Sequence, residues 1–191
     1  MRSKELVDNF NKQVPLIDEL LPFVGDKKKV KIADIGSGPV SSIGSFLPGV
    51  EVEVCPSDNQ DWTEWWNKRR EWWKTDLKPF IPVEYQNMER LTYPDESFDI
   101  VWCHNALDHT MNAKEAVKEM IRVCKKGGYV YIMCSLNQLD TGYLHHWNAK
   151  QDGVFTNKRE IFDLKEFGFQ IRFTDNGGKS RYNFITAILK K

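Results

Sequence analysis

Two glycines one residue apart follow an apolar, β-branched run, and an aspartate comes just before them. The segment reads V-K-I-A-D-I-G-S-G-P over residues 30–39, with the carboxylate at Asp34 and the glycines at Gly36 and Gly38. Glycine permits the positive φ of a tight turn, and its missing Cβ lets a ligand approach the backbone. Ligands of open α/β sheets bind at the carboxyl ends of the strands. The pattern therefore predicts a ligand-binding loop between a strand and a helix.

A nicotinamide dinucleotide fits this loop poorly. The dinucleotide fingerprint requires a third glycine three residues after the second, and that position holds Ser41. The chain also lacks a Tyr-x-x-x-Lys pair. Both observations disfavour a nicotinamide-dependent oxidoreductase.

A second group of acid–base side chains follows the apolar run 97–104, which reads as a buried strand. Asp108 and His109 lie in the polar segment that starts at Asn105. Imidazole titrates near neutral pH, so His109 is our candidate general base, with Asp108 or Asn105 orienting it. The alternative is that Asp108 and His109 only shape the loop and cap the next helix.

Two adjacent histidines lie in the least regular part of the chain, between residues 135 and 155. His145 and His146 stand next to Tyr143 and Trp147. We take His146 as a further catalytic candidate; the alternative is that both histidines are surface residues. No metal site is predicted, because no carboxylate lies at ligand spacing near them in the sequence. The four cysteines form no C-x-x-C pair, so neither a zinc site nor a disulfide framework is expected.

A carboxylate after the second predicted strand is a candidate for nucleoside binding. The alternation of valines predicts this strand over 50–55, and Asp58 follows it. An acid in this position can accept hydrogen bonds from both ribose hydroxyls of a nucleoside. The last residue of the predicted strand, however, is Cys55.

The elements that position these residues alternate between strand and helix patterns, which predicts a parallel, doubly wound sheet. We expect strands over 30–35, 50–55, 83–85, 97–104 and 129–134, and helices over 40–47, 61–77, 112–125 and 157–167. Residues 1–24 read as a helical leader, interrupted or restarted at Pro15. Residues 169–174 and 183–189 read as an antiparallel C-terminal hairpin.

Composition excludes some partner classes. The chain has 191 residues with 27 basic and 27 acidic side chains, so no charge excess favours nucleic acid. No apolar run reaches the roughly 20 residues of a membrane span, and the first residues are too polar for a signal peptide. We expect a single cytoplasmic domain that acts on a small molecule.

Tryptophan is concentrated in the predicted helix 61–77. Five tryptophans, at positions 62, 65, 66, 72 and 73, fall at spacings that place them on one broad face. This face packs on the sheet or the leader in the simplest interpretation. The alternatives are an aromatic wall over a cofactor or substrate, or a contact between two copies in a homodimer.

Three segments together resemble class I S-adenosylmethionine-dependent methyltransferases of the type 11 kind. They are D-I-G-S-G-P at 34–39, N-M-E-R-L…P-D-E-S-F-D-I-V-W at 87–102, and N-A-L-D-H…A-V-K-E-M-I-R-V-C-K-K-G-G-Y-V-Y-I at 105–132. The resemblance implies a Rossmann-like seven-stranded, mostly parallel sheet with helices on both faces and an antiparallel C-terminal hairpin. It also implies one methyltransferase domain over 1–191, with the leader at 1–24 and a substrate-side insertion at 136–156.

The resemblance further implies S-adenosylmethionine as cofactor and S-adenosylhomocysteine as product. In this family the glycine loop lies against the methionine part of the cofactor. The positions of this sequence that match are Asp34, Gly36, Ser37 and Gly38.

Other site positions are implied in the same way. The residue before Met88 usually holds an acid for the adenine amino group; here it is Asn87, whose side-chain oxygen can accept that bond, with the Met88 backbone amide alongside. His104 and Asn105 flank the sulfonium and the substrate side. The ribose-binding acid normally ends the second strand, a position held here by Cys55, and Asp58 is its candidate replacement.

The expected function is methyl transfer to a small polar acceptor, such as a sugar or another metabolite. The segment 136–155 is too short for a macromolecule-binding domain, and the chain has no basic stripe. The alternative is a catalytically degenerate member of the fold that binds S-adenosylmethionine or a protein partner. That alternative is motivated by Cys55 and by the tryptophan-rich helix.

Overall fold

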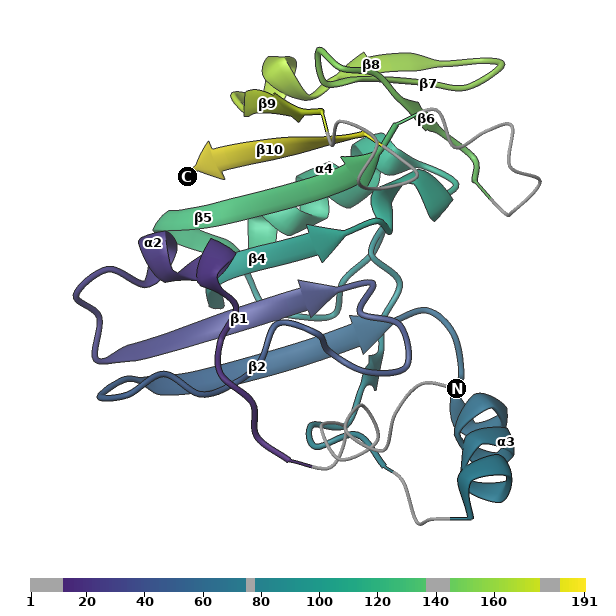
Figure 1. The fold of residues 1–191 in the computed structure, drawn as a ribbon. Coiled ribbons are helices and arrows are strands. Elements are labelled where there is room, and N and C mark those ends of the chain that lie inside the picture. Colours follow the sequence, from purple (N-terminus) through teal and green to yellow (C-terminus); the bar gives the residue numbers. More distant parts are fainter. Residues whose placement is uncertain (1–11, 75–77, 137–144, 176–182) are drawn as a thin grey trace.

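A seven-stranded sheet forms the centre of the computed structural model, which describes residues 12–74, 78–136, 145–175 and 183–191 (Figure 1). Its strand order is β3-β2-β1-β4-β5-β10-β9. The strands are β1 (Lys29–Ile35), β2 (Glu51–Asp58), β3 (Glu84–Tyr85), β4 (Phe98–His104), β5 (Cys124–Ser135), β9 (Gln170–Thr174) and β10 (Phe184–Lys190). The first five pair in parallel, whereas β10 is antiparallel to both β5 and β9. This confirms the predicted sheet and its C-terminal hairpin.

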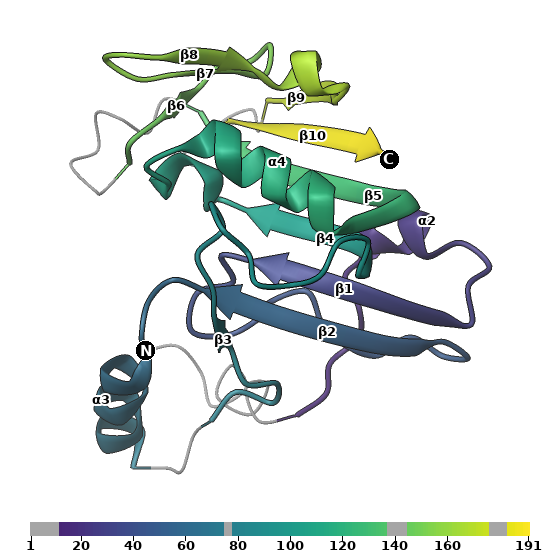
Figure 2. The ribbon, with the colours of Figure 1, turned by 180° about the vertical axis from the view of Figure 1, so that it is seen from behind.

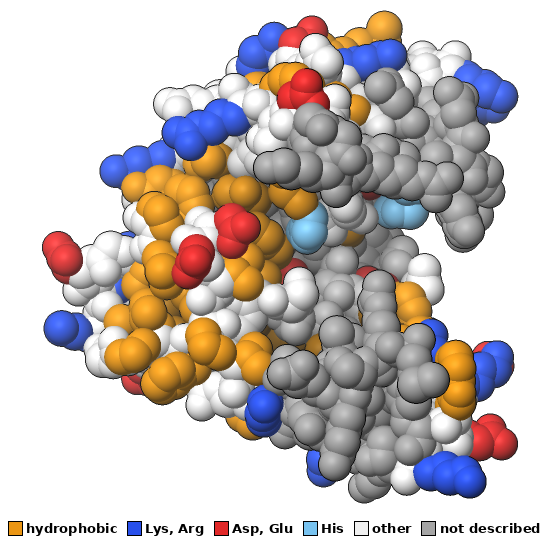
Figure 3. Space-filling model, in the orientation of Figure 1, with side chains coloured by type: hydrophobic (Ala, Val, Ile, Leu, Met, Phe, Trp, Pro, Cys, Tyr) orange, Lys and Arg blue, Asp and Glu red, His pale blue; other side chains and the backbone are white. Residues whose placement is uncertain are grey.

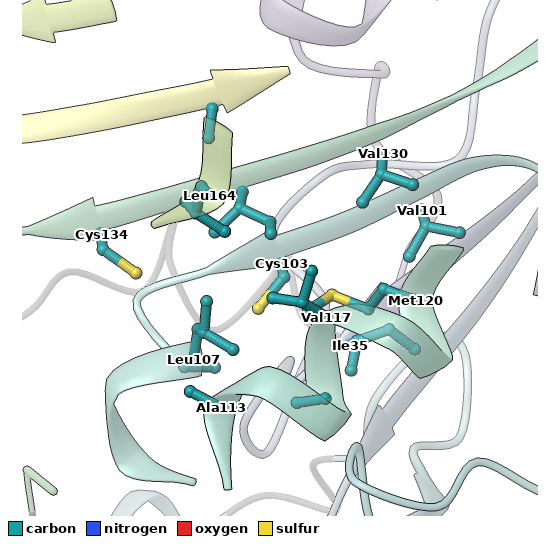
Figure 4. Close-up of a cluster of buried hydrophobic side chains, with 14 of the residues drawn as sticks. Ile35, Val101, Cys103, Leu107, Ala113, Val117, Met120, Val130, Cys134 and Leu164 are labelled. Carbon is teal, nitrogen blue, oxygen red and sulfur yellow. The ribbon is translucent and has the colours of Figure 1, made fainter. Parts of the chain in front are cut away.

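Helices cover both faces of the sheet, as Figures 1 and 2 show from opposite sides. On one face lies α4 (Ala113–Val123), whose buried residues recur at helical spacing and pack over β4 and β5 (Figure 4). The short helices η1 (Asp18–Leu20) and α2 (Leu21–Val24) lie on the other face. They bury Leu20 and Val24 against Ile32 and Ile100 of the central strands.

The start of α4 follows its local sequence. The side chain of Asn112 accepts a hydrogen bond from the Glu115 N–H at 3.1 Å and so caps the start of the helix predicted over 112–125. The Glu115 carboxylate pairs with Lys118. The helix ends at Val123, earlier than predicted.

A small second sheet completes the face that carries α4. It consists of β6 (Asn148–Ala149), β7 (Val154–Thr156) and β8 (Ile161–Asp163), all antiparallel. Trp147, Phe155 and Phe162 join the same buried cluster as α4. The prediction of a helix over 157–167 was wrong, and only η4 (Leu164–Phe167) is helical. The reason is a turn at Asn157, whose side chain accepts the N–H groups of both Arg159 and Glu160.

The connection from β1 to β2 contains no helix, contrary to the prediction for 40–47. Phe46 instead forms a parallel bridge with Pro15, and the Leu16 N–H donates to the Phe46 carbonyl at 2.8 Å. Residues 12–17 are therefore extended along this connection rather than helical. The remainder of the predicted leader, residues 1–11, lies outside the described residues.

The predicted helix 61–77 is observed as α3 (Thr63–Trp73), which stands away from the sheet beyond the end of β2 (Figures 1 and 2). Its tryptophans do not form one covered face, because Trp66 is buried and Trp72 is 72% exposed. Arg69 lies over the rings of Trp65 and Trp72. Among the described residues, no helix is long and apolar enough to cross a membrane.

Candidate active site

The glycine loop after β1 is held against β2 by its own backbone. The N–H groups of Gly36 and Ser37 both donate to the Ser57 carbonyl, at 2.8 and 3.0 Å. Gly36 and Gly38 have φ values of 73° and 69°, a region that favours glycine. The sequence expectation of a tight glycine turn is therefore confirmed.

The two glycines serve different purposes. A Cβ added to Gly36 would overlap the Cβ of Ala106 in the segment after β4, and would press on Met88 at 3.1 Å. A Cβ added to Gly38 would meet nothing within 4 Å. Gly36 thus allows two loops to pack together, and Gly38 is the glycine that leaves open space for a ligand.

Strand β2 ends at Asp58, not at Cys55 as predicted. Its parallel pairing with β1 continues through Pro56 and Ser57. Strand β3 pairs only with Ser57 and Asp58, so Pro56 interrupts no hydrogen bonds on that side. Asp58 is therefore the carboxylate that ends the strand, and Cys55 lies within it.

The Asp58 carboxylate is fixed before any ligand binds. Its Oδ2 accepts the Gly38 N–H, and its Oδ1 accepts the Gln60 N–H, both at 2.9 Å. Each carboxylate oxygen has further lone pairs for a ligand hydroxyl. The strand end and the glycine loop therefore form one rigid unit.

A cleft of about 590 Å³ opens at the carboxyl ends of β1, β2 and β4, and we call it the strand-end cleft. Figure 3 shows a hollow on the face that Figure 1 presents, with histidine side chains near its rim. Eight residues proposed from the sequence line the cleft: Gly36, Gly38, Asp58, Asn87, Met88, Asn105, His109 and His146. Trp62, which the sequence offered as part of a possible aromatic wall over a ligand, also lines the cleft. Seven others were not identified from the sequence: Asn59, Gln60, Gln86, Glu89, Ala106, Thr110 and Met111. Most of these are adjacent in the sequence to a proposed residue, and this adjacency could have identified them.

Asn87 and Met88 lie in a tight turn at the edge of the cleft. The Asn87 carbonyl accepts the Arg90 N–H, and its side-chain Oδ1 accepts the Glu89 N–H, both at 2.9 Å. A carbonyl oxygen has two lone pairs, so Oδ1 retains one for a ligand. The turn is further tied to the β4 side of the cleft, because the Glu89 carboxylate accepts the Met111 N–H at 2.7 Å.

Asp34 lies behind the glycine loop and does not line the cleft. It is 3% exposed, and its Oδ2 has no hydrogen-bond partner among the described residues. Burial raises the pKa of Asp34 to about 6 from an ordinary value of 3.8, and the nearby Asp58 carboxylate adds to the rise. The loop is thus backed by a buried carboxyl group that titrates in a mildly acidic range.

His104 lies on the opposite face of the sheet from α4. Successive strand residues point to opposite faces, so His104 shares its face with Trp102, and their ring centroids are 6.0 Å apart. Both line a separate cavity of about 1010 Å³ beside α2. Burial lowers the pKa of His104. The next residue, Asn105, has a φ of 50° and does line the strand-end cleft.

Asp108 contacts His145, a partner that the sequence did not indicate. The Asp108 Oδ2 lies 2.6 Å from the His145 Nδ1, and Asp108 is 2% exposed. The two residues are 37 positions apart, so their spacing in the sequence did not indicate this contact. Asp108 is therefore the orienting partner of His145.

A second, smaller pocket adjoins the strand-end cleft, and we call it the side pocket. It has a volume of about 480 Å³, and Met111 and His146 line both cavities. His145 and the turn residues 157–160 complete its wall. The two cavities are thus neighbours that share part of their walls.

Comparison with solved structures shows the fold. A SAM-dependent methyltransferase from Methanosarcina mazei superposes with a TM-score of 0.54 at 19% identity, covering 93% of this chain and 99% of that one. The [4+2]-cyclase SpnF superposes with a TM-score of 0.56 at 12% identity, covering 91% and 79%.

Comparison of sequences shows the family. An uncharacterized methyltransferase of Bacillus subtilis, YcgJ, is 45% identical over 111 residues, which are 51% of this chain and 38% of that protein. The chain spans half or less of the length of the curated relatives it matches. A family model described as a methyltransferase domain matches residues 33–132. Because that match covers more than half of the sequence, the chain belongs to the class I S-adenosylmethionine-dependent methyltransferase family.

Proposed function

We propose that this protein binds S-adenosylmethionine in the strand-end cleft and transfers its methyl group to a small polar acceptor in the side pocket. The observation that carries the proposal is the Asp58 carboxylate, which ends β2 and is held by the Gly38 N–H of the glycine loop. A strand-end carboxylate beside a glycine loop suits a nucleoside whose ribose bears two adjacent hydroxyls.

The residues of the cleft fit this cofactor. Asp58 would accept the ribose hydroxyls, while the open space at Gly38 admits the methionine part. Asn87 Oδ1 retains a lone pair for the adenine amino group, beside the Met88 backbone amide. The buried Asp34 carboxylate behind the loop complements a positively charged ligand. A volume of about 590 Å³ also lies within the usual range of small-molecule sites.

When bound, S-adenosylmethionine supplies a methyl group on a sulfonium sulfur, and the electron pair of the broken S–C bond stays on sulfur in S-adenosylhomocysteine. The acceptor atom forms the new bond to the methyl carbon with its own lone pair. A hydroxyl acceptor also loses its proton, and we assign its reception to His146, which lines both cavities. Positioning by the two adjoining cavities supplies much of the rate, since orientation alone contributes about 7–11 kcal/mol in favourable cases.

A second candidate is a member of the fold that binds the cofactor without methyl transfer. One structural neighbour is a [4+2]-cyclase, so likeness of fold by itself does not imply transfer. Methyl transfer and binding are therefore tested separately.

The test is a calorimetric titration with S-adenosylmethionine, S-adenosylhomocysteine and NADH. We expect the first two ligands to bind and NADH not to bind. Asp58→Asn should weaken binding by about 1–3 kcal/mol, or roughly 5- to 150-fold. The matched control is Glu51→Gln at the opposite, exposed end of β2, which should bind as the wild type does.

Absence of binding by both sulfur ligands, or unchanged affinity in Asp58→Asn, would contradict the assignment of the cleft. Transfer itself is measured with methyl-labelled S-adenosylmethionine and a panel of hydroxylated, carboxylated and amino acceptors. Binding without labelled product from any acceptor class would favour the second candidate.

A further inference from the structure

Three potential metal ligands converge where the strand-end cleft meets the side pocket. Asp108 and His109 belong to η2 (Leu107–His109), the helical turn after β4, and His145 comes from the segment after β5. One ligand atom of each residue lies within 4.8 Å of the other two. The rings of His109 and His145 have centroids 4.3 Å apart. We call these three residues the Asp-His-His cluster.

The backbone holds the Asp-His-His cluster together. The N–H groups of His146 and Trp147 both donate to the Asp108 carbonyl, at 2.8 and 3.1 Å. The Trp147 indole is 1% exposed and donates to the Thr110 carbonyl at 3.0 Å. His145 is therefore fixed against η2 by its neighbours in the chain, and its position does not depend on a side-chain contact alone.

Only one of the two carboxylate oxygens of Asp108 has a hydrogen-bond partner among the described residues. A buried carboxylate is costly unless it is paired and its oxygens are hydrogen-bonded. Oδ2 of Asp108 meets His145, but Oδ1 is buried without a hydrogen-bond partner among the described residues. A simple Asp–His hydrogen bond leaves this second oxygen unexplained, whereas a cation beside it would not.

We propose that the Asp-His-His cluster binds a divalent transition-metal ion of the Zn²⁺ and Co²⁺ class. Two imidazoles and one carboxylate form a nitrogen and oxygen donor set that suits these ions. Three protein ligands leave coordination positions for another molecule, as in catalytic rather than structural sites. Sequence spacing did not indicate this site, because its carboxylate and His145 are 37 positions apart.

The position of the cluster also defines a class of acceptor, and this step rests on the proposed function. His109 lines the strand-end cleft and His145 lines the side pocket, so an ion between them lies on the boundary between the two cavities. An acceptor with oxygen donors, such as a hydroxy acid or a diol, would bind the ion. His146 lies outside the cluster and remains beside the acceptor.

The test is a titration of the tag-free, EDTA-dialysed protein with Co²⁺ and then Zn²⁺, followed by calorimetry and by visible absorption. We expect one ion per chain, a visible Co²⁺ band, and displacement of that band by Zn²⁺. His109→Ala and His145→Ala should each weaken binding at least about tenfold. His109 is exposed, so His109→Ala tests the site with little risk to folding. The matched control is His104→Ala, which removes an imidazole on the other face of the sheet and should bind as the wild type does.

No stoichiometric binding, or equal binding by the wild type and both cluster variants, would overturn the metal site and leave an Asp–His pair alone. S-adenosylmethionine is titrated into the same samples. Cofactor binding without metal binding overturns only this inference, whereas metal binding without cofactor binding overturns only the proposed function.

Discussion

Asp34→Asn tests whether a charged carboxylate is held behind the glycine loop. Burial raises the pKa of Asp34 to about 6 from its ordinary value of 3.8. At about 1.36 kcal/mol per pKa unit, the buried charge costs about 3 kcal/mol of folding free energy. Because Asp34 is almost completely buried, solvent screening reduces this value little.

The direction in which stability changes with pH follows from proton linkage. The folded protein holds the Asp34 proton to a higher pH than the unfolded chain does, so stability from this group is present below about pH 4 and is lost as the pH rises to about 6. Asparagine carries no charge at either pH. The free energy of unfolding of Asp34→Asn, relative to the wild type, should therefore increase by about 2 kcal/mol between pH 4 and pH 7, since part of the full effect already falls below pH 4.

The assay is urea unfolding of both proteins at a series of pH values across that interval. Comparing the two proteins at each pH cancels the titration of all other groups, and any packing effect of asparagine appears as a constant offset. Asp26→Asn, at an exposed position in the turn before β1, is the control and should show a flat difference. A flat difference for Asp34→Asn as well would show that Asp34 is not a buried titrating group.

Four further substitutions test other parts of the structure. Gly38→Ala should cost about 1–2 kcal/mol of stability from its positive φ alone, whereas Gly36→Ala should cost about 2–5 kcal/mol because its methyl group also overlaps Ala106; urea unfolding measures both, and equal losses would contradict the packing argument. Trp147→Phe should cost about 1–3 kcal/mol through the lost indole bond to the Thr110 carbonyl and should weaken Co²⁺ binding; unchanged thermal stability would show that this bond does not anchor the segment. Asn112→Ala should cost about 1 kcal/mol at the start of α4 and leave cofactor affinity unchanged, as calorimetry would check.

Local patterns in the sequence were sufficient for the framework of the fold. The apolar runs of β1 and β4 predicted strands because a strand buried on both faces is apolar at nearly every position, and the alternating valines of β2 predicted a half-buried strand. The helix α4 was likewise predicted, over 112–125, because its apolar residues recur at helical spacing and Asn112 can cap its start. The glycine loop and several cleft residues, such as Asp58 and Asn105, followed from their positions near strand ends.

Tertiary contacts decided the parts where the local pattern failed. Residues 40–47 have helical spacing, but their backbone pairs with the extended segment at Pro15, which competes with helix formation. β2 extends to Asp58 because pairing with β1 continues past Pro56. In both cases the segment that forms the pairing is distant in the sequence, so no local pattern could indicate the observed structure.

The residues of the candidate site also depend partly on local sequence and partly on tertiary contacts. The sequence by itself determined the family, the glycine loop and the presence of acid and imidazole groups after β4, since each depends on residues within one segment. Only the tertiary structure decided which groups meet. It placed Asp108 against His145, 37 positions away in the sequence, and it turned His104 to the other face of the sheet, because strand alternation and the docking of Trp147 set these directions.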